Sequence, residues 1–326
     1  MAKDNLNKKR NFDIEVIADT YAGKLALPYV AAAVKSPDTV ANGFVRQIDG
    51  LNKKAVLGNV GSPTPVVADA CGFTDNSNTT FDEQVLTLTQ YKVNEEICRG
   101  TVFPTWIGEN MDRNGDLPTS FSDFLMATVA ANAGQQIENG IWRGILDGTN
   151  NSVGFLSNDG VFNAAGWAAS ATANFQGQAI SAITNSNAVD QLGLVYDNAV
   201  ANVPGILSKP DVCFYVSLKT YGLYMQELAK AGNGQGINSL GSNQSLQSMT
   251  YLGIPIHVCP GTFDDSIVLT YASNMVYGTN LATDWTEAQI IPTYEYMGND
   301  AVRIIMNFAV GVQTAVKGDG VVGHTH

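Results

Sequence analysis

The sequence contains few residues that could catalyse a reaction or hold a metal ion. Among 326 residues there are only 3 histidines and 4 cysteines. The cysteines are far apart and form no Cys-x-x-Cys pair, which argues against a zinc framework or a redox motif. We therefore expect four reduced and mostly packed thiols, at Cys71, Cys98, Cys213 and Cys259.

Long apolar runs are also missing. No stretch approaches the roughly 18 residues that a membrane helix needs, and the first residues lack the hydrophobic core of a signal peptide. Synthesis in the cytosol is the expectation. No Pro/Ser linker or low-complexity block divides the chain, so we expect one interwoven unit.

Charge is scarce as well. Asp, Glu, Lys and Arg make up 15% of the residues, against a usual figure near 25%. Much of the surface must then be uncharged and polar, which favours large contacts between subunits; the alternative is a neutral surface on a soluble monomer. The net charge of −12 argues against a chain whose main task is to hold nucleic acid.

Catalytic and ligand-binding motifs are likewise absent. No Gly-x-Ser-x-Gly or His-Glu-x-x-His pattern occurs. His324 and His326 lie in a glycine-rich tail, and His257 lies in a strand pattern, where a core or interface role is the simplest interpretation. We expect neither an enzyme nor a cofactor or metal site.

Two short motifs have partial similarity to ligand-binding loops. Gly232–Gly236 is glycine-rich but lacks the Gly-Lys-Ser/Thr sequel of a phosphate loop, so a flexible loop is favoured over a nucleotide site. Asp112–Asp116 has alternating oxygen ligands, but Leu117 stands where a calcium loop needs glycine. A polar turn is favoured there.

A long helix is the clearest local prediction. Apolar residues recur at steps of three and four from Phe121, and Asp147-Gly148 ends the pattern. Such a helix of about 27 residues would reach roughly 40 Å. Its apolar stripe consists of Phe121, Phe124, Leu125, Thr128, Val129, Ile137, Ile141, Ile145 and Leu146.

The residues before this helix predict an arm. Residues 1–39 fit an extended segment with at most one short helix, over 28–34. Ala55–Leu57 and 64–68 then flank a turn at Gly58–Gly61, and Gln84–Val93 alternates as one strand. Because an isolated two-stranded arm is marginal in water, it is expected to lie on something else.

The remaining pattern predicts a layered α+β domain. Helical spacing covers residues 188–201 and 218–231. Strands are predicted at 211–217, 254–258, 267–271, 287–296 and 301–312.

Particular residues in this order resemble a known family. Glu138-Asn-Gly140, Gly144–Gly148 and Gly154-Phe-Leu156 are similar to the end of the spine helix and the following turn in tailed-bacteriophage major capsid proteins, which share the HK97-like fold. Leu252–Val258 resembles the family's Gly-x-Pro strand, and Val276–Leu281 a later strand. Asn280 stands where an acid is commoner. The resemblance extends over roughly residues 40 to 316.

The resemblance implies a division of the chain. It comprises an N-terminal arm (1–39), a β-hairpin called the E-loop (40–100), a peripheral domain (101–176 and 273–310, with the spine helix at about 120–146) and an axial α/β domain (177–272 and 311–326).

The resemblance also implies a structural role. Such chains assemble into hexamers and pentamers of an icosahedral shell around phage dsDNA, in a virion built in the bacterial cytoplasm. Expected partners are a separate scaffolding protein, a portal protein, decoration proteins and nonspecifically bound packaged dsDNA. No membrane contact is expected, and no scaffolding domain is expected before the arm.

Candidate contact residues follow from that comparison. Lys8, Lys9 and Arg10 lie in residues 1–54, whose net charge is positive, and are candidates for contact with DNA or a scaffold, with a solvated terminus as the alternative. Some relatives join an E-loop lysine to an asparagine of a neighbouring subunit. Lys53 and Lys54 lie where the arm begins, but no partner asparagine or assisting glutamate maps onto this sequence, so ordinary solvated lysines are favoured there. The candidate subunit contacts are Lys53, Lys54, Val56, Leu57, Val60, Val66 and Val67 in the E-loop, and Gly232, Asn233, Gly234 and Gln235 in an axial loop.

Two other functions stay open from sequence alone. An encapsulin, which is a nanocompartment shell of the same fold, would hold an enzyme cargo in place of a genome. A soluble α/β ligand-binding or catalytic protein would instead be a monomer or small oligomer with a defined pocket.

Overall fold

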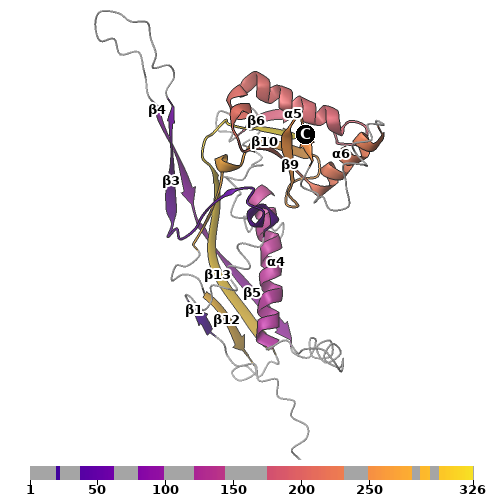
Figure 1. The fold of residues 1–326 in the computed structure, drawn as a ribbon. Coiled ribbons are helices and arrows are strands. Elements are labelled where there is room, and N and C mark those ends of the chain that lie inside the picture. Colours follow the sequence, from indigo (N-terminus) through magenta and orange to yellow (C-terminus); the bar gives the residue numbers. More distant parts are fainter. Residues whose placement is uncertain are drawn as a thin grey trace, which may run out of the picture.

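The computed structural model describes residues 20–22, 37–61, 80–98, 121–143, 175–230, 249–280, 287–293 and 301–325. In these ranges the chain forms two six-stranded sheets, a separate two-stranded hairpin and several helices. The expected α+β class is confirmed. The two sheets lie at opposite ends of an elongated body, and the hairpin projects from its side (Figure 1).

The first sheet is built around one long strand. Strand β13 (Ala301–Thr314) pairs antiparallel with β5 (Thr89–Cys98), β12 (Glu287–Pro292) and β11 (Met275–Thr279). Two short strands complete the sheet: β1 (Thr20–Ala22) pairs with β12, and β2 (Arg46–Ile48) pairs parallel with β11.

Helix α4 (Phe121–Arg143) runs along this sheet (Figure 1). Its buried side chains recur at helical spacing and join the same core cluster as the buried face of β13. The predicted helix is confirmed from Phe121 to Arg143, and its predicted last turn lies outside the described residues. The buried hydrophobic residues of α4 are Met126, Val129, Ala130, Ala133, Ile137, Ile141 and Trp142.

The second sheet has the strand order β6-β14-β10-β7-β9-β8. Its inner strands β7 (Val212–Val216) and β10 (Ser266–Tyr271) are buried along their whole length, which explains their continuous apolar sequence. The outer strands are β6 (Gln176–Ala179), β14 (Val321–His324), β9 (Ile254–Val258) and β8 (Thr250–Tyr251).

Helices α5 (Ala188–Asn202) and α6 (Leu218–Lys230) pack on this second sheet. Both helices, and strands β7, β9 and β10, lie within two residues of the positions that the sequence predicts. Two 3-10 turns act as connections: η1 (Pro204–Ser208) lies between α5 and β7, and η2 (Ala272–Asn274) joins β10 to β11 of the first sheet.

The hairpin differs from its prediction. Strand β3 (Lys54–Gly61) runs straight through the residues expected to form the turn and pairs antiparallel with β4 (Thr80–Thr87). The predicted turn at Gly58–Gly61 is therefore wrong, because Gly58 lies opposite Glu83 in the ladder. The connection between the two strands falls outside the described residues.

The predicted single strand Gln84–Val93 is also wrong. The chain changes partner at Leu88: β4 pairs with β3, whereas β5 pairs with β13. Leu86 and Leu88 are both buried, so the alternation of buried and exposed residues continues through the change. The hydrogen bond from Leu88 N to Lys53 O, at 2.9 Å, closes the root of the hairpin.

A pair of glycines makes room for that root. Gly278 of β11 lies directly opposite Gly311 of β13. A Cβ at Gly278 would collide with the side chain of Leu86, and one at Gly311 would collide with the backbone oxygen of Thr87. The chain can cross the sheet at this glycine notch only because neither residue has a side chain.

Residues 37–48, which we call the arm segment, connect the two sheets. The segment contains helix α2 (Asp38–Ala41), which the sequence did not predict, and ends in β2 of the first sheet. The predicted short helix at 28–34 lies outside the described residues. Val40, Phe44 and Val45 are buried in the same core cluster as α4.

Candidate functional site

The predicted contact residues of the hairpin fall on or beside β3. Val56 and Val60 are on one face, and Leu57 is half-buried on the other. The ladder places Val85 opposite Val56 and Phe81 opposite Val60. Because alternate residues of a strand share a face, all four side chains lie on the same side of the hairpin.

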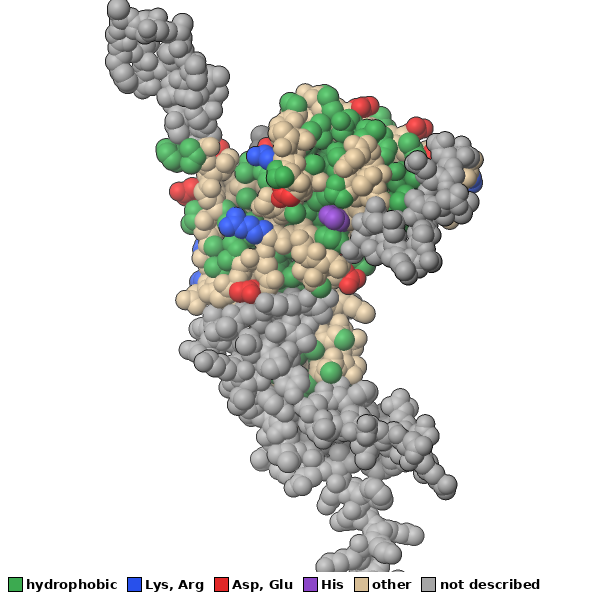
Figure 2. Space-filling view, viewed as in Figure 1, with side chains coloured by type: hydrophobic (Ala, Val, Ile, Leu, Met, Phe, Trp, Pro, Cys, Tyr) green, Lys and Arg blue, Asp and Glu red, His purple; other side chains and the backbone are tan. Residues whose placement is uncertain are grey.

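This side, which we call the apolar face, is exposed to solvent. The exposed fractions are 61% for Val56, 59% for Val60, 75% for Phe81 and 42% for Val85. Apolar side chains are visible on the described part of the hairpin in Figure 2. Glu83 stands between the two pairs, opposite Gly58. The sequence did not predict Phe81 and Val85 as contact residues. Their place beside Val60 and Val56 follows only from the strand register.

The other predicted contact residues are less informative. Lys53 lies at the root of the hairpin and Lys54 begins β3, and both are exposed. Outside the described residues lie Val66, Val67, the axial-loop residues Gly232, Asn233, Gly234 and Gln235, and the basic residues Lys8, Lys9 and Arg10.

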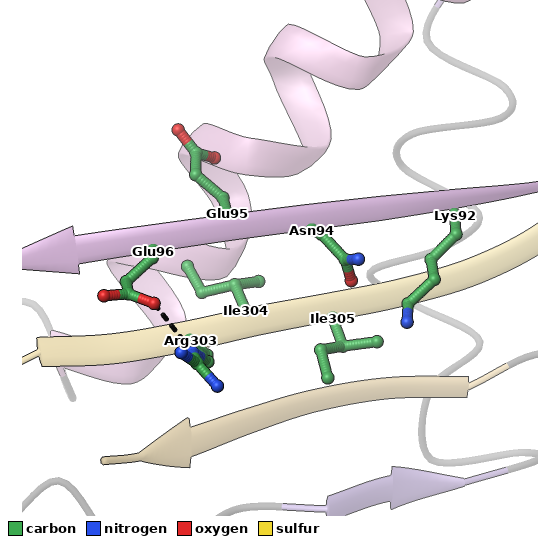
Figure 3. A pocket seen from close by; sticks show the side chains of 7 residues that line it. All are labelled: Lys92, Asn94, Glu95, Glu96, Arg303, Ile304 and Ile305. Atoms are coloured by element: carbon green, nitrogen blue, oxygen red, sulfur yellow. Dashed lines mark hydrogen bonds and ion pairs between the residues drawn. The ribbon is translucent and has the colours of Figure 1, made fainter. Parts of the chain in front are cut away.

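An open hollow of about 280 Å³ lies where β5 meets β13 (Figure 3). Arg303 Nε donates to Glu96 Oε2 at 2.7 Å across the ladder, and Lys92 and Asn94 project from the same side of β5. Both partners of the ion pair are partly exposed, so it contributes about 0–1 kcal/mol. The hollow is open to solvent and lacks the enclosure of a small-molecule site.

A second hollow, of about 570 Å³, lies between β5 and α4. Amide side chains dominate its wall, which fits a wet surface groove better than a ligand pocket. It is lined by Lys92, Val93, Asn94, Glu95, Val129, Asn132, Ala133, Gln135, Gln136 and Asn139.

The carboxylate of Glu138 on α4 is buried and accepts three hydrogen bonds. Its Oε1 accepts from the hydroxyl of Thr39 at 2.6 Å and from Gly261 N at 3.4 Å, and its Oε2 accepts from Thr39 N at 3.0 Å. Burial raises the pKa of Glu138; the hydrogen bonds from Thr39 and Gly261 oppose that shift, and the charge of Asp38 adds to it. Sequence reasoning gave Glu138 no role, although it sits next to the buried Ile137.

His257 lies on β9 and packs against the arm segment. Its ring stacks on Phe44 with centroids 4.0 Å apart, and its Nδ1 is buried without a hydrogen-bond partner among the described residues. Burial lowers the pKa of His257. Within the described ranges, no three His, Cys, Asp or Glu residues are placed to hold a metal ion.

Three of the four cysteines are described. Cys213 and Cys259 are buried, and burial raises the pKa of Cys213 to about 12. Cys98, at the end of β5, is exposed instead of packed. All three are free thiols.

None of the described helices is both long enough and apolar enough to cross a membrane.

Comparison with solved structures identifies the fold. A chain of Gordonia phage Cozz superimposes with a TM-score of 0.56 at 11% identity, covering 88% of this chain and 86% of that one. A chain from the capsid of an empty GTA particle gives a TM-score of 0.55 at 15% identity, covering 90% of each chain. This chain has a capsid fold.

The capsid fold is also similar to a third structure. The virus-like particle from Pyrococcus furiosus gives a TM-score of 0.50 at 11% identity and covers 93% of this chain and 99% of that one. No protein-family model and no curated protein matches the sequence. At such low identity the likeness establishes the fold, and the high coverage shows that it extends over both sheets and is not confined to one domain.

Proposed function

We propose that this chain is the major capsid protein of a tailed bacteriophage, with an HK97-like fold. It assembles into hexamers and pentamers of an icosahedral shell that encloses phage dsDNA. The likeness to a phage chain and to the capsid of a GTA particle supports this proposal. Its role is structural, without catalysis or a cofactor.

The apolar face of the hairpin is the observation that carries the proposal. A two-stranded hairpin that stands away from both sheets has no core of its own. Burial of side chains such as Val60 and Phe81 would contribute about 1.5–3 kcal/mol each. The apolar face is therefore expected to be buried against another molecule. In a shell, that molecule is a second copy of the chain.

The parts of the subunit then have distinct tasks. The hairpin is the E-loop and extends over a neighbour, while α4 and the first sheet form the peripheral domain. The second sheet with α5 and α6 forms the axial domain near the symmetry axis of each capsomer. Many weak contacts of this kind add up through multivalency. A separate scaffold, a portal and packaged dsDNA are the proposed partners, and the virion is the proposed location.

Size-exclusion chromatography and negative-stain electron microscopy of the purified chain test the proposal. Shells or capsomer rings are expected, with the chain alone or with the scaffold encoded beside its gene. A homogeneous monomer in both preparations would contradict it and would favour the soluble ligand-binding alternative.

A compartment shell of the encapsulin type is the second candidate. The likeness to a virus-like particle from Pyrococcus furiosus favours it, because that chain is covered almost completely. The contents of particles purified from the native host distinguish the two. Nuclease-protected DNA supports the virus, whereas a single co-purified enzyme inside the shell supports the compartment.

A further inference from the structure

Glu138 joins three segments that are distant in sequence. The carboxylate belongs to α4, the Thr39 donors belong to α2 of the arm segment, and the Gly261 donor belongs to the connection between β9 and β10 of the second sheet. Thr39 N is one of the first amides of α2, which has no internal acceptor, and Pro37 at the N-cap offers no side-chain acceptor. Glu138 therefore caps α2 from another element.

The hydroxyl of Thr39 is held from both sides. It donates to Glu138 Oε1 at 2.6 Å and accepts from the indole N–H of Trp142 at 2.8 Å. Trp142 lies one helical turn beyond Glu138 on α4, and both residues are buried. The pair thus fixes the orientation of the Thr39 side chain as well as its distance from the helix.

Gly261 approaches α4 more closely than any other residue type would allow. A Cβ at this position would collide with the backbone oxygen of Glu138 and would lie 2.8 Å from Cδ1 of Trp142. The Gly261 amide therefore reaches the carboxylate only because the residue is glycine. This contact places the second sheet against the helix that covers the first.

The other end of the arm segment is also held by the second sheet. Tyr215 of β7 donates its hydroxyl to Phe44 O at 2.6 Å, and His257 of β9 stacks on the Phe44 ring. Beyond Phe44, β2 pairs with β11 of the first sheet. The arm segment consequently bridges both sheets, with Glu138 at the point where all three parts meet.

We propose that Glu138 is a conformational latch, whose carboxylate fastens the arm segment and the second sheet to α4 at the same time. Opening the latch releases α2 and the β9–β10 connection together, while both sheets stay folded. The latch belongs to the single subunit and does not depend on whether the chain forms a shell.

Amide hydrogen exchange, measured residue by residue on the unassembled full-length chain, tests the latch. The variant Glu138→Gln keeps the shape of the side chain but replaces one acceptor oxygen by a donor. Protection of Thr39 N–H and Gly261 N–H should fall by about tenfold or more, the change expected when a hydrogen bond to a charged group is lost. Amides of Phe214 in β7 and Ile304 in β13 should keep their protection.

Glu227→Gln is the matched control. Glu227 Oε2 accepts from Val189 N, near the start of α5, at 2.8 Å, so it caps a helix in the way that Glu138 does. Its loss should affect Val189 and leave Thr39 and Gly261 unchanged. The variant Thr39→Val replaces the hydroxyl by a methyl group and leaves the Thr39 N–H in place. The latch predicts faster exchange at Gly261, which is distant from Thr39 in sequence.

Two results would overturn the proposal. Unchanged protection at Gly261 in both Glu138→Gln and Thr39→Val would show that the arm segment and the second sheet are not coupled. Equal loss of protection at Thr39, Phe214 and Ile304 would show that Glu138 supports the whole fold and does not act as a local latch. Failure of the assembly experiment would not affect either of these results, because hydrogen exchange is measured on the unassembled chain.

Discussion

The indole nitrogen of Trp142 donates to the hydroxyl of Thr39 at 2.8 Å, although the two residues are 103 positions apart. Replacing Trp142 by Phe removes that donor and leaves a small void, so the unassembled chain should lose about 2 kcal/mol of unfolding free energy. Urea unfolding measures the loss. In a Thr39→Val background the same change should cost about 1 kcal/mol less. Equal costs in both backgrounds would contradict the interaction.

Gly261→Ala tests how closely the second sheet approaches α4. The added methyl group would collide with backbone at Glu138, which cannot move without shifting the helix, so a loss of about 1–3 kcal/mol is expected. Gly222→Ala in α6 is the control, since a Cβ there meets nothing within 4 Å. That change should stabilise the chain by about 0.5–1 kcal/mol. Similar urea midpoints for the two variants would argue against the close contact.

The apolar face of the hairpin predicts a defect in assembly without a defect in folding. Val60→Ser combined with Phe81→Ser should abolish particles in negative-stain images. The unfolding free energy of the single chain should change by less than about 0.5 kcal/mol per site, because both side chains are exposed there. Asn59→Ser on the opposite face is the control and should assemble normally. Normal particles from the double variant would remove this face from the interface.

His257 predicts a dependence of stability on pH. Burial lowers its pKa, so the folded chain binds the proton less tightly than the unfolded chain. The stability that neutral His257 provides is complete above the unfolded pKa of about 6.5 and is lost as the pH falls through that value toward the lower folded pKa. Between pH values of about 7.5 and 5.5, the Tm of His257→Phe should therefore fall less than that of the wild type. Parallel curves of Tm against pH would refute the assignment.

Leu252 adopts a backbone conformation that is unfavourable for leucine. Its φ of 49° and the φ of 85° at Gly253 are both positive, as in the tight turn between β8 and β9 that favours Asn-Gly. Leu252→Asn should stabilise the chain by about 1 kcal/mol in urea, because the left-handed region costs roughly 1–2 kcal/mol for ordinary residues. Gly253→Ala should destabilise it. A loss of stability in Leu252→Asn would contradict this explanation.

The helices and buried strands of the second sheet could be predicted from sequence because each has a local signal. Helix α5 shows helical spacing and is followed by Pro204, which begins a 3-10 turn. Strand β7 is a continuous apolar run between polar residues, as a strand buried on both faces should be. In these elements, the spacing of apolar residues and the residues at which each element ends both agree with the observed burial.

The hairpin could not be predicted in detail because its signals are not local. Gly58 and Gly61 suggest a turn, but Gly58 faces Glu83 across the ladder and leaves open space there. The change of partner at Leu88 cannot be seen in the alternation of apolar and polar residues. Leu86 and Leu88 both pack near Gly278 of the first sheet, so the alternation continues through the change. The partner and the register of β5, which follows the hairpin, depend on residues more than 200 positions away.

The buried contacts of Glu138 were equally hidden. A glutamate in a helical pattern ordinarily faces solvent, and its partners Thr39 and Gly261 lie 99 and 123 positions away. Only the three-dimensional arrangement shows that an acidic residue beside the apolar stripe accepts hydrogen bonds from two other segments. The resemblance to capsid proteins predicted the order of the elements, but it did not predict this contact.

The root of the hairpin packs at the glycine notch formed by Gly278 and Gly311, so a small tilt there would move the far end of the hairpin. Strand β3 spans 8 residues, so the described part of the hairpin is about 26 Å long at roughly 3.3 Å per residue. A tilt of about 10° at the notch would displace its far end by about 4–5 Å, more than the length of one residue along a strand. In the proposed shell, two positions without side chains, both inside the first sheet, would therefore determine how far from that sheet the hairpin meets a neighbouring subunit.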